Sequence, residues 1–223
     1  MAAIDNVNTL VYRVLRMNDF IEIPASKKSL SLRKPVYGVG TNDADYIVKP
    51  IIGGRRVICP FYRKWQSMLM RCYSGKYQEK YPTYAGCSVC SEWLTFSIFK
   101  AWMEKQEWQS MQLDKDLIVC GNKIYSPEFC VFVPSQLNAL LLDNSAARGE
   151  WPQGVHFRKQ CAKFQSYCNV NGTQKHLGLF TTPESASNAY KAFKSNRVKE
   201  VAQEYKSNTK LYDALMIHAS LFK

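Results

Sequence analysis

Cysteine and histidine are the side chains in this sequence best suited to binding a metal ion, and eight cysteines stand beside only three histidines. Cys87 and Cys90 are separated by two residues, which is the spacing of half of a structural zinc site. No second pair with this spacing occurs, so the other ligands would come from isolated cysteines. The candidate zinc ligands are Cys72, Cys87, Cys90 and Cys130. The alternative is that these cysteines are small buried hydrophobic side chains.

The charge of the chain predicts a polyanionic partner. Lysine and arginine number 30 against 18 acidic residues, which gives a formal net charge of +12 and a pI near 9.3. Nucleic acid is the first candidate and an anionic membrane surface is the second. No apolar run approaches the roughly 20 residues of a membrane span. Asp5 and Asp19 interrupt the N-terminal segment, so we expect no secretory signal. Disulfides need an oxidising compartment, so we expect the cysteines to be reduced.

The elements that would position these groups follow from the hydrophobic pattern. Apolar side chains recur at helical spacing in residues 61–74 and 92–105, which predicts two helices, and Thr95 is placed to cap the second. Gly53–Gly54 separates two short β-like runs and predicts a hairpin. From Leu113 to Val133 we expect a strand to Cys120, a turn at Gly121–Asn122, an irregular segment and a second strand. At 46% hydrophobic and 13% aromatic residues, the chain can bury a core, which excludes disorder as its main state.

The last part of the chain has the clearest pattern. Three short strands are predicted over residues 155–159, 164–170 and 174–180. Asn171–Gly172 favours a two-residue hairpin turn between the last two, because both positions of such a turn need positive φ. Thr182–Glu184 then begins a helix with a capping hydroxyl, a proline at the first helical position and an acidic first turn.

These strands and this helix carry an ordered set of short motifs. The motifs are Gly154-Val155, Lys163-Phe164, Asn171-Gly172, Leu177-Gly178-Leu179-Phe180, Thr182-Pro183-Glu184 and Ala189-Tyr190. The set resembles the DNA-binding domain of plant ethylene-response factors and its phage and bacterial relatives. The resemblance implies a three-stranded antiparallel sheet packed on one helix, with the sheet in the major groove of double-stranded DNA.

Strand alternation independently assigns polar side chains to one face of this sheet. If Phe164 faces the helix, every second residue from Gln165 to Asn169 faces outwards. The candidate DNA-binding residues are His156, Arg158, Lys159, Lys163, Gln165, Tyr167, Asn169, Gln174, Lys175 and His176. Arginine suits guanine, glutamine and asparagine suit adenine, and lysine suits phosphate. The alternative is a polar sheet face that only contacts water.

A second ordered set of motifs runs through residues 65–130. It includes Arg71-Cys72, Val89-Cys90-Ser91-Glu92-Trp93, Leu113-Asp114-Lys115, and Tyr125-Ser126-Pro127-Glu128 followed by Cys130. The set resembles phage proteins of the HNH endonuclease type. This resemblance implies a small domain of the ββα-metal type. An active enzyme of this kind needs a histidine that activates water, and an oxygen ligand that holds Mg or Mn on the scissile phosphate.

The oxygen ligands for such a metal would lie after the second predicted helix. The candidate catalytic residues are Asp114, Asp116, Asn122 and Glu128. No histidine occurs in residues 1–155, and Lys115 or Asp116 stands where the resemblance places the first one. The missing base predicts a degenerate nuclease centre. The alternative role for the two aspartates is to cap a loop or to form salt bridges.

The sequence therefore predicts an α+β protein in three parts. These are an N-terminal arm and hairpin (1–59), a degenerate HNH-like domain (60–143) and an ethylene-response-factor-like domain with a C-terminal helix (151–223). The leading function is a phage-encoded protein that binds double-stranded DNA in the cytoplasm of an infected bacterial host, without membrane association. One alternative is an active metal-dependent DNA endonuclease. The other is a phage effector that binds and inhibits a host protein.

Overall fold

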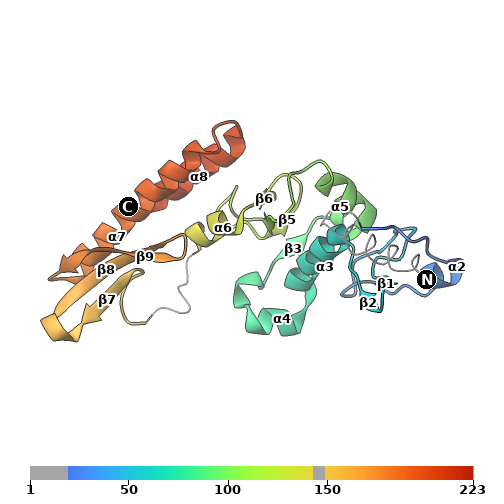
Figure 1. Cartoon of the computed structure of the whole chain (residues 1–223), viewed down its shortest axis with the longest axis horizontal. Helices are drawn as coiled ribbons and strands as arrows, with labels where there is room; N and C mark the ends of the chain where they lie inside the picture. Colours follow the sequence, from blue (N-terminus) through green and yellow to red (C-terminus); the bar gives the residue numbers. More distant parts are fainter. Residues whose placement is uncertain (1–19, 143–148, 223) are drawn as a thin grey trace, which may run out of the picture. The chain divides into compact units, whose positions relative to one another are not determined.

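The computed structural model describes residues 20–142 and 149–222, which have mixed α+β structure (Figure 1). They form two compact units. Unit 1 holds the described residues up to Leu113 together with Lys123–Glu128, and unit 2 holds Asp114–Asn122 and the described residues from Phe129 onwards. Residues 1–19 of the predicted arm and 143–148 at the predicted domain boundary lie outside the described residues. None of the described helices is long and apolar enough to cross a membrane.

Unit 1 is built around α3 (Pro60–Tyr73), which confirms the first predicted helix. Pro60 stands at the first helical position, where a missing N–H removes no helical hydrogen bond. Trp65, on the buried side of α3, donates from its indole nitrogen to the carbonyl oxygen of Trp93 at 2.7 Å. The Trp65 ring also packs on Phe96, with 5.5 Å between centroids. These contacts hold α3 against α5 (Phe96–Met103).

The remaining elements of unit 1 are short. They are α2 (Lys27–Ser31), β1 (Ile51–Ile52), β2 (Arg55–Arg56), α4 (Gly75–Lys80), η1 (Pro82–Tyr84), β3 (Ser88–Val89), η2 (Glu92–Leu94) and β5 (Ile124–Tyr125). β1 and β2 form the predicted antiparallel hairpin, with Gly53 and Gly54 at positive φ in its turn. β3 pairs with β5 in parallel. Unit 1 is therefore completed by a strand that follows an excursion of the chain into unit 2.

The second predicted helix is interrupted at Thr95. Its N-terminal part is the short helix η2, and α5 starts only after Thr95, whose backbone is extended with φ −97° and ψ 125°. The Thr95 side chain makes no capping hydrogen bond. Instead, the Asp43 carboxylate accepts a hydrogen bond from the backbone amide of Ser97 at 2.9 Å. The predicted cap is wrong because a residue distant in sequence supplies the acceptor.

The strand predicted from Leu113 to Cys120 is also shorter than expected. β4 covers only Gln112–Asp114, and the chain then bends into a loop. The Asp114 carboxylate starts this loop by accepting hydrogen bonds from the backbone amides of Asp116 and Leu117, at 3.0 and 2.7 Å. An aspartate that binds the backbone two or three residues ahead favours a turn over an extended strand.

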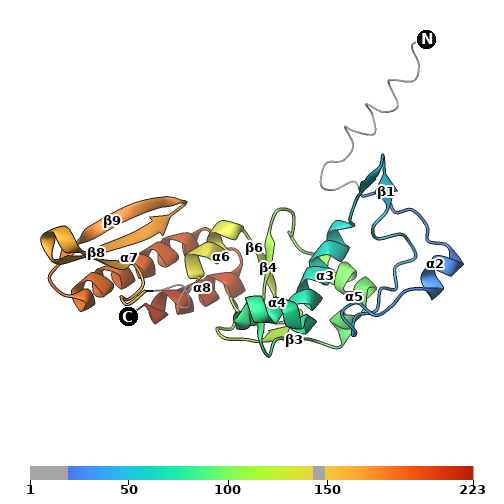
Figure 2. The ribbon, with the colours of Figure 1, turned by 90° about the horizontal axis from the view of Figure 1, so that it is seen from below.

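Unit 2 combines a three-stranded antiparallel sheet with helices. Its elements are β6 (Val131–Val133), α6 (Ser135–Leu141), β7 (Val155–Arg158), η4 (Lys159–Cys161), β8 (Lys163–Val170), β9 (Thr173–Phe180), α7 (Pro183–Gln203) and α8 (Thr209–Leu221). The strand order is β7-β8-β9. Helix α7 runs along one face of the sheet (Figures 1 and 2). The predicted strands, the turn at Asn171–Gly172 and the Thr182 cap of α7 are all confirmed.

A hydrophobic core joins the helices of unit 2. Val198 of α7 and Leu215 of α8 are fully buried in it. Leu117 from the loop after β4 and Leu137 from α6 pack into the same core. The ring Nε2 of His218 lies 2.9 Å from the carbonyl oxygen of Leu117, which ties α8 to this loop. For this reason the segment predicted as one middle domain is divided between the two units.

Candidate nucleic-acid interface

The polar side chains of β7, β8 and β9 form cross-strand rows on one face of the sheet. The rows are Arg158–Lys163, His156–Gln165–Leu179, Tyr167–His176 and Asn169–Gln174. Residues that pair directly across strands point to the same side. This side, called the outer face below, contains every predicted DNA-binding residue except Lys159 and Lys175.

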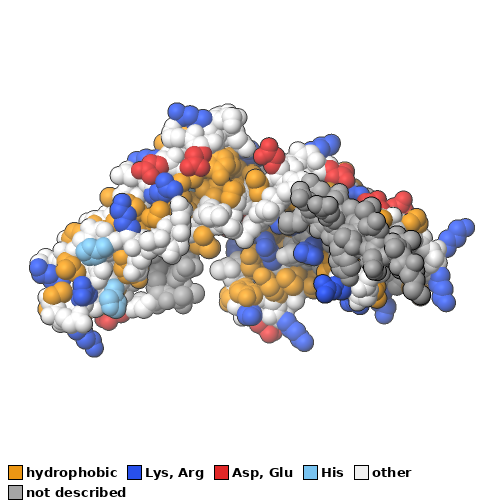
Figure 3. Space-filling view, viewed as in Figure 1, with side chains coloured by type: hydrophobic (Ala, Val, Ile, Leu, Met, Phe, Trp, Pro, Cys, Tyr) orange, Lys and Arg blue, Asp and Glu red, His pale blue; other side chains and the backbone are white. Residues whose placement is uncertain are grey.

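The opposite side of the sheet packs on α7. Ser166 and Cys168 on β8 are 0% and 2% exposed, whereas Asn169 is exposed and Gln165 is half-buried. This difference between alternate residues confirms the alternation predicted for β8. Figure 3 shows histidine side chains close to lysine and arginine side chains over the β7–β9 region. The outer face therefore presents polar and cationic groups to solvent.

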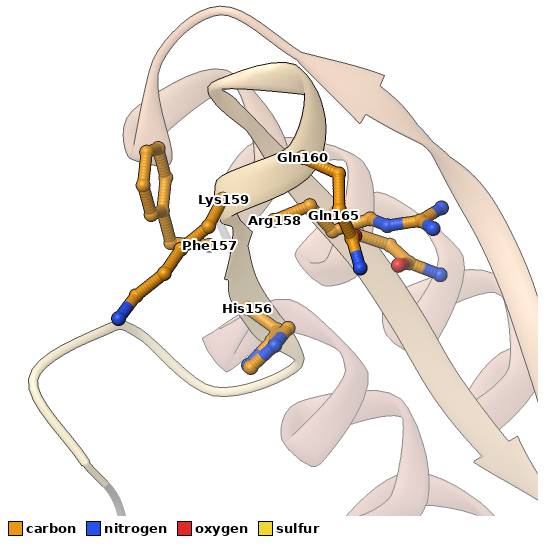
Figure 4. A pocket seen from close by; sticks show the side chains of 6 residues that line it. All are labelled: His156, Phe157, Arg158, Lys159, Gln160 and Gln165. Atoms are coloured by element: carbon orange, nitrogen blue, oxygen red, sulfur yellow. The ribbon is translucent and has the colours of Figure 1, made fainter.

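One end of the outer face is hollowed. A depression of about 600 Å³ is lined by His156, Phe157, Arg158, Lys159, Gln160 and Gln165. In Figure 4 the guanidinium of Arg158 lies next to the amide of Gln165, whereas the Phe157 ring points to the other side of the strand. Lys159 and Gln160 belong to η4, which closes the strand end. The hollow thus brings a guanidinium and an amide together where a ligand can reach both.

The charge of this sheet is entirely positive. Residues 155–180 contain four lysines and arginines and no aspartate or glutamate. Arg158, Lys159 and Lys163 are exposed, and within residues 20–142 and 149–222 none of the three forms an ion pair with a carboxylate. Each of these cations is therefore available to an anionic partner such as a phosphate.

Lys175 is placed differently from the other predicted cations. It pairs with Cys168, and both therefore point towards α7. The Lys175 ammonium lies 4.8 Å from the centroid of the Phe193 ring, in a cation–π contact. Strand alternation puts Lys175 on the side opposite its neighbours Gln174 and His176. The structure thus assigns Lys175 to the contact between sheet and helix.

Leu179 is a member of the outer face that the sequence did not indicate. Strict alternation from His176, a predicted DNA-binding residue, directs both Leu177 and Leu179 towards the helix. A register shift between Ser166 and Tyr167 reverses the sides, so that Leu179 is 42% exposed. The available signal was Gly178, because a glycine inside a strand often marks a bulge.

The inner side of the sheet holds the outer residues in position. Phe164 packs on Phe157 and on Trp151, with centroid separations of 5.0 and 4.9 Å. Gly154 precedes β7 with φ +75°, and an added Cβ would overlap the ring of Tyr190 on α7. Only glycine combines this backbone conformation with so close an approach. The chain is therefore fixed on the helix at the residue just before β7.

A buried cation lies between β8 and α7. Lys194 is 5% exposed, and its ammonium is 5.9 Å from the centroid of the Tyr190 ring. Burial lowers the pKa of Lys194, and the nearby Cys168 opposes this effect. Burial also raises the pKa of the Cys168 thiol. Both groups are thus shifted towards their neutral forms, as a dry contact between sheet and helix requires.

The structure brings three of the predicted catalytic residues together in one loop of unit 2. Lys115, 6% exposed, donates from its ammonium to the Asp116 carboxylate and to the Asn122 carbonyl oxygen, both at 3.0 Å. The Asn122 amide donates to the Lys115 carbonyl oxygen at 2.6 Å. Burial, and then the charge of Asp116, raise the pKa of Asp114. A divalent cation needs oxygen ligands, and in this loop the Asp116 carboxylate and the Asn122 carbonyl oxygen already bind the buried Lys115 ammonium. The loop therefore does not fit a divalent cation.

The fourth predicted catalytic residue, Glu128, belongs to unit 1 and accepts a hydrogen bond from a neighbouring serine hydroxyl at 2.7 Å. Cys72 and Cys87 of the same unit are buried, and burial raises the pKa of the half-buried Cys90. Cys130 of unit 2 is buried as well. In the part of the chain that the structure describes, no group of three or more His, Cys, Asp or Glu side chains is arranged to hold a metal ion. The structural zinc stays a prediction.

Comparison of the chain with models of protein families, with curated proteins and with solved structures finds no match. The resemblances to ethylene-response-factor domains and to phage HNH proteins rest on short motifs and stay predictions. The geometry and charge of the outer face are therefore the main basis for assigning a function.

Proposed function

We propose that this chain is a phage-encoded protein that binds double-stranded DNA, with the outer face of β7–β9 in the major groove. The observation that carries the proposal is a solvent-facing set of hydrogen-bonding rows in a segment without a carboxylate. The major groove is about 12 Å wide and admits a two-stranded β-ribbon. Neighbouring strands are about 4.8 Å apart, so two of these strands fit side by side within it.

Arg158 and Gln165 would read base edges in this complex. Their head groups lie next to each other at the hollow (Figure 4). A guanidinium can donate two hydrogen bonds to guanine, and a glutamine amide can both donate to and accept from adenine. Asn169 and Gln174, paired near the hairpin turn, offer a second amide pair. The outer face would then read bases at two places along the groove.

Lys159 and Lys163 would contact the phosphates beside the groove. Both are exposed, and they flank the turn that joins β7 to β8. Contacts of this kind position a protein on DNA without selecting a sequence. They also release counterions, so binding weakens as salt rises.

The finer parts of the proposal rest on the motifs. The order of motifs in residues 65–130 supports a degenerate HNH-like fold for the middle of the chain, and the order in residues 154–193 supports an ethylene-response-factor-like fold for the last part. A phage protein of this type would act in the cytoplasm of an infected bacterial host. The contacts of Lys115 within its loop favour DNA binding without cleavage over metal-dependent endonuclease activity.

The test is a selection of bound duplexes from a random-sequence pool by the full chain, followed by affinity measurements over a range of salt. We expect an enriched sequence and a logarithm of affinity that falls linearly with the logarithm of salt. The substitution Arg158→Ala should weaken binding to the selected duplex by about 1–3 kcal/mol and relax the preference at one base pair.

Arg197→Ala provides the matched control. It removes the same charge from α7, where the guanidinium already pairs with Glu200 at 3.1 Å. We expect this variant to keep the base preference of the native chain. Equal effects of the two substitutions would contradict the assignment of the outer face. Absence of salt-dependent binding in the native chain would contradict DNA binding altogether.

A further inference from the structure

The chain contains two long segments without an acidic residue, and only one of them contains the three-stranded sheet. Residues 151–183, between Glu150 and Glu184, include β7–β9. Residues 46–78, between Asp45 and Glu79, are an equally long segment that belongs to unit 1. The cations of this second segment are Lys49, Arg55, Arg56, Arg63, Lys64, Arg71 and Lys76. Its charge is therefore higher than that of the proposed DNA-binding sheet.

The structure gathers part of this charge on the β1–β2 hairpin and the start of α3. Lys49 joins the two elements, because its ammonium donates to the Gln66 side chain at 2.9 Å and lies 5.2 Å from the Tyr62 ring. Burial, and then the nearby charge of Arg56, lower the pKa of Lys49. Lys49, Arg55 and Arg56 are called the hairpin surface below.

The hairpin surface has no internal counter-charge. Arg55 and Arg56 are exposed, and within the described ranges neither of them, nor Lys49, forms an ion pair with a carboxylate. By contrast, Lys100 in the same unit pairs with two glutamates at 2.7 and 3.7 Å. Like charges held close together repel, and binding of a polyanion relieves that repulsion.

The shape of the hairpin also suits the partner. Ile51 pairs with Arg56 and Ile52 pairs with Arg55, so each side of the hairpin carries one guanidinium and one aliphatic side chain. Ile51 is 69% exposed. The turn between the strands consists of two glycines and adds no side chain to the tip. Proteins that contact the minor groove of DNA combine arginines with apolar side chains in this way.

We infer that the hairpin surface is a second contact with duplex DNA, made to the phosphates along the minor groove and independent of base sequence. The inference rests on the proposed function, since it assumes the same class of partner, but different residues carry it. Each neutralised phosphate adds about 0.9 to the slope of the logarithm of affinity against the logarithm of salt. The hairpin surface thus adds affinity, and the outer face supplies base preference.

The experiment compares two double variants of the full chain. Arg55→Gln/Arg56→Gln removes two charges from the hairpin, and Lys199→Gln/Lys206→Gln removes two exposed charges from the end of α7 and the turn after it. The probes are a random-sequence duplex and the selected duplex. For the hairpin variant we expect affinity for both duplexes to fall by about 8-fold per lost contact at 0.1 M salt, with a slope lower by about 2. The control should keep the native slope.

The outcomes separate this inference from the proposed function. Equal slopes in the two double variants, or a changed base preference with an unchanged slope in the hairpin variant, would overturn the second contact. If Arg158→Ala still loses its base preference in that case, the proposed function stands alone. If the native chain binds neither duplex, both fail. Unfolding curves for each variant show whether a loss of affinity reflects a loss of fold.

Discussion

Two polar regions of unit 2 contain similar side chains and use them in opposite ways. In the loop Asp114–Asn122 the polar groups bind one another and the backbone, and the central Lys115 is 6% exposed. On the outer face of the sheet, Asn169 and Gln174 point to solvent and leave the packing on α7 to residues such as Cys168. The first region is internally satisfied, and the second offers its hydrogen bonds to a partner.

The difference comes from what the backbone needs in each place. Strands β7, β8 and β9 satisfy one another through their ladder, so their outer side chains are not required for folding. A loop has no such ladder, and its buried backbone groups need side-chain partners. Polar residues in a sequence are therefore better evidence for binding when they alternate along a strand than when they cluster after one.

The largest expected effect tests the structural role of the loop. Asp114→Ala should lower the free energy of unfolding by about 2–3 kcal/mol, because two backbone amides lose their acceptor. Asp114→Asn keeps one acceptor oxygen and should lose less. Urea unfolding followed by tryptophan fluorescence measures both. If the free energy of unfolding of Asp114→Ala equalled that of the native chain, the loop would not depend on this carboxylate. A catalytic role for Asp114 would then have to be considered again.

The next effect tests the sheet side of the comparison. Gln165→Ala should weaken binding to the selected duplex by about 1–2 kcal/mol, because the proposed contact of its amide with a base edge is lost. The free energy of unfolding should change by less than about 0.5 kcal/mol, as for other surface substitutions. Gln203→Ala, at the exposed end of α7, is the control and should leave affinity unchanged. Loss of stability instead of affinity in Gln165→Ala would assign this side chain to folding.

Local signals in the sequence predicted much of this fold. Alternation along β8, the turn at Asn171–Gly172 and the start of α7 at Thr182 are encoded within a few residues, and all are confirmed. The start of α5 was not predictable in this way, because Asp43 supplies its acceptor from a distant part of the chain. The packing of Leu117 against α8 likewise depends on a contact between distant residues.

The candidate site shows the same limit. Its polar rows follow from the period of a strand, and eight of the ten predicted residues lie on them. The bulge between Ser166 and Tyr167 decides where Leu179 points, and only Gly178 hints at it in the sequence. Lys175 differs, because it stands between Gln174 and His176 and alternation along β9 alone already directs it to the helix side, as its pairing with Cys168 shows. The register of a strand pair depends on both strands, so it cannot be predicted from the pattern of either strand alone.

A smaller effect, opposite in sign, concerns the support under the sheet. Lys194→Met should raise the free energy of unfolding by about 1 kcal/mol at neutral pH, because a buried ammonium is replaced by an apolar side chain of similar length. The folded-state pKa of Lys194 lies below its ordinary value of 10.5. The folded state therefore loses this proton first as the pH rises, and the native chain gains stability between the lowered value and 10.5. The difference between variant and native chain should shrink over that window, and a constant difference would show that Lys194 is not the titrating group.

The smallest expected effect tests the bulge that shapes the outer face. Leu179→Ser should leave the free energy of unfolding within about 0.5 kcal/mol of the native value, because this side chain is already exposed to solvent. Binding should fall by no more than about 0.5–1 kcal/mol, and only for selected duplexes with a thymine methyl opposite this position. Leu177→Ser, two residues earlier and half-buried, should show the reverse, with a loss of stability and no specific loss of binding. If the two variants exchanged these effects, the register of β9 would be shifted by one residue, and Gln174 and His176 would face the helix in place of the DNA.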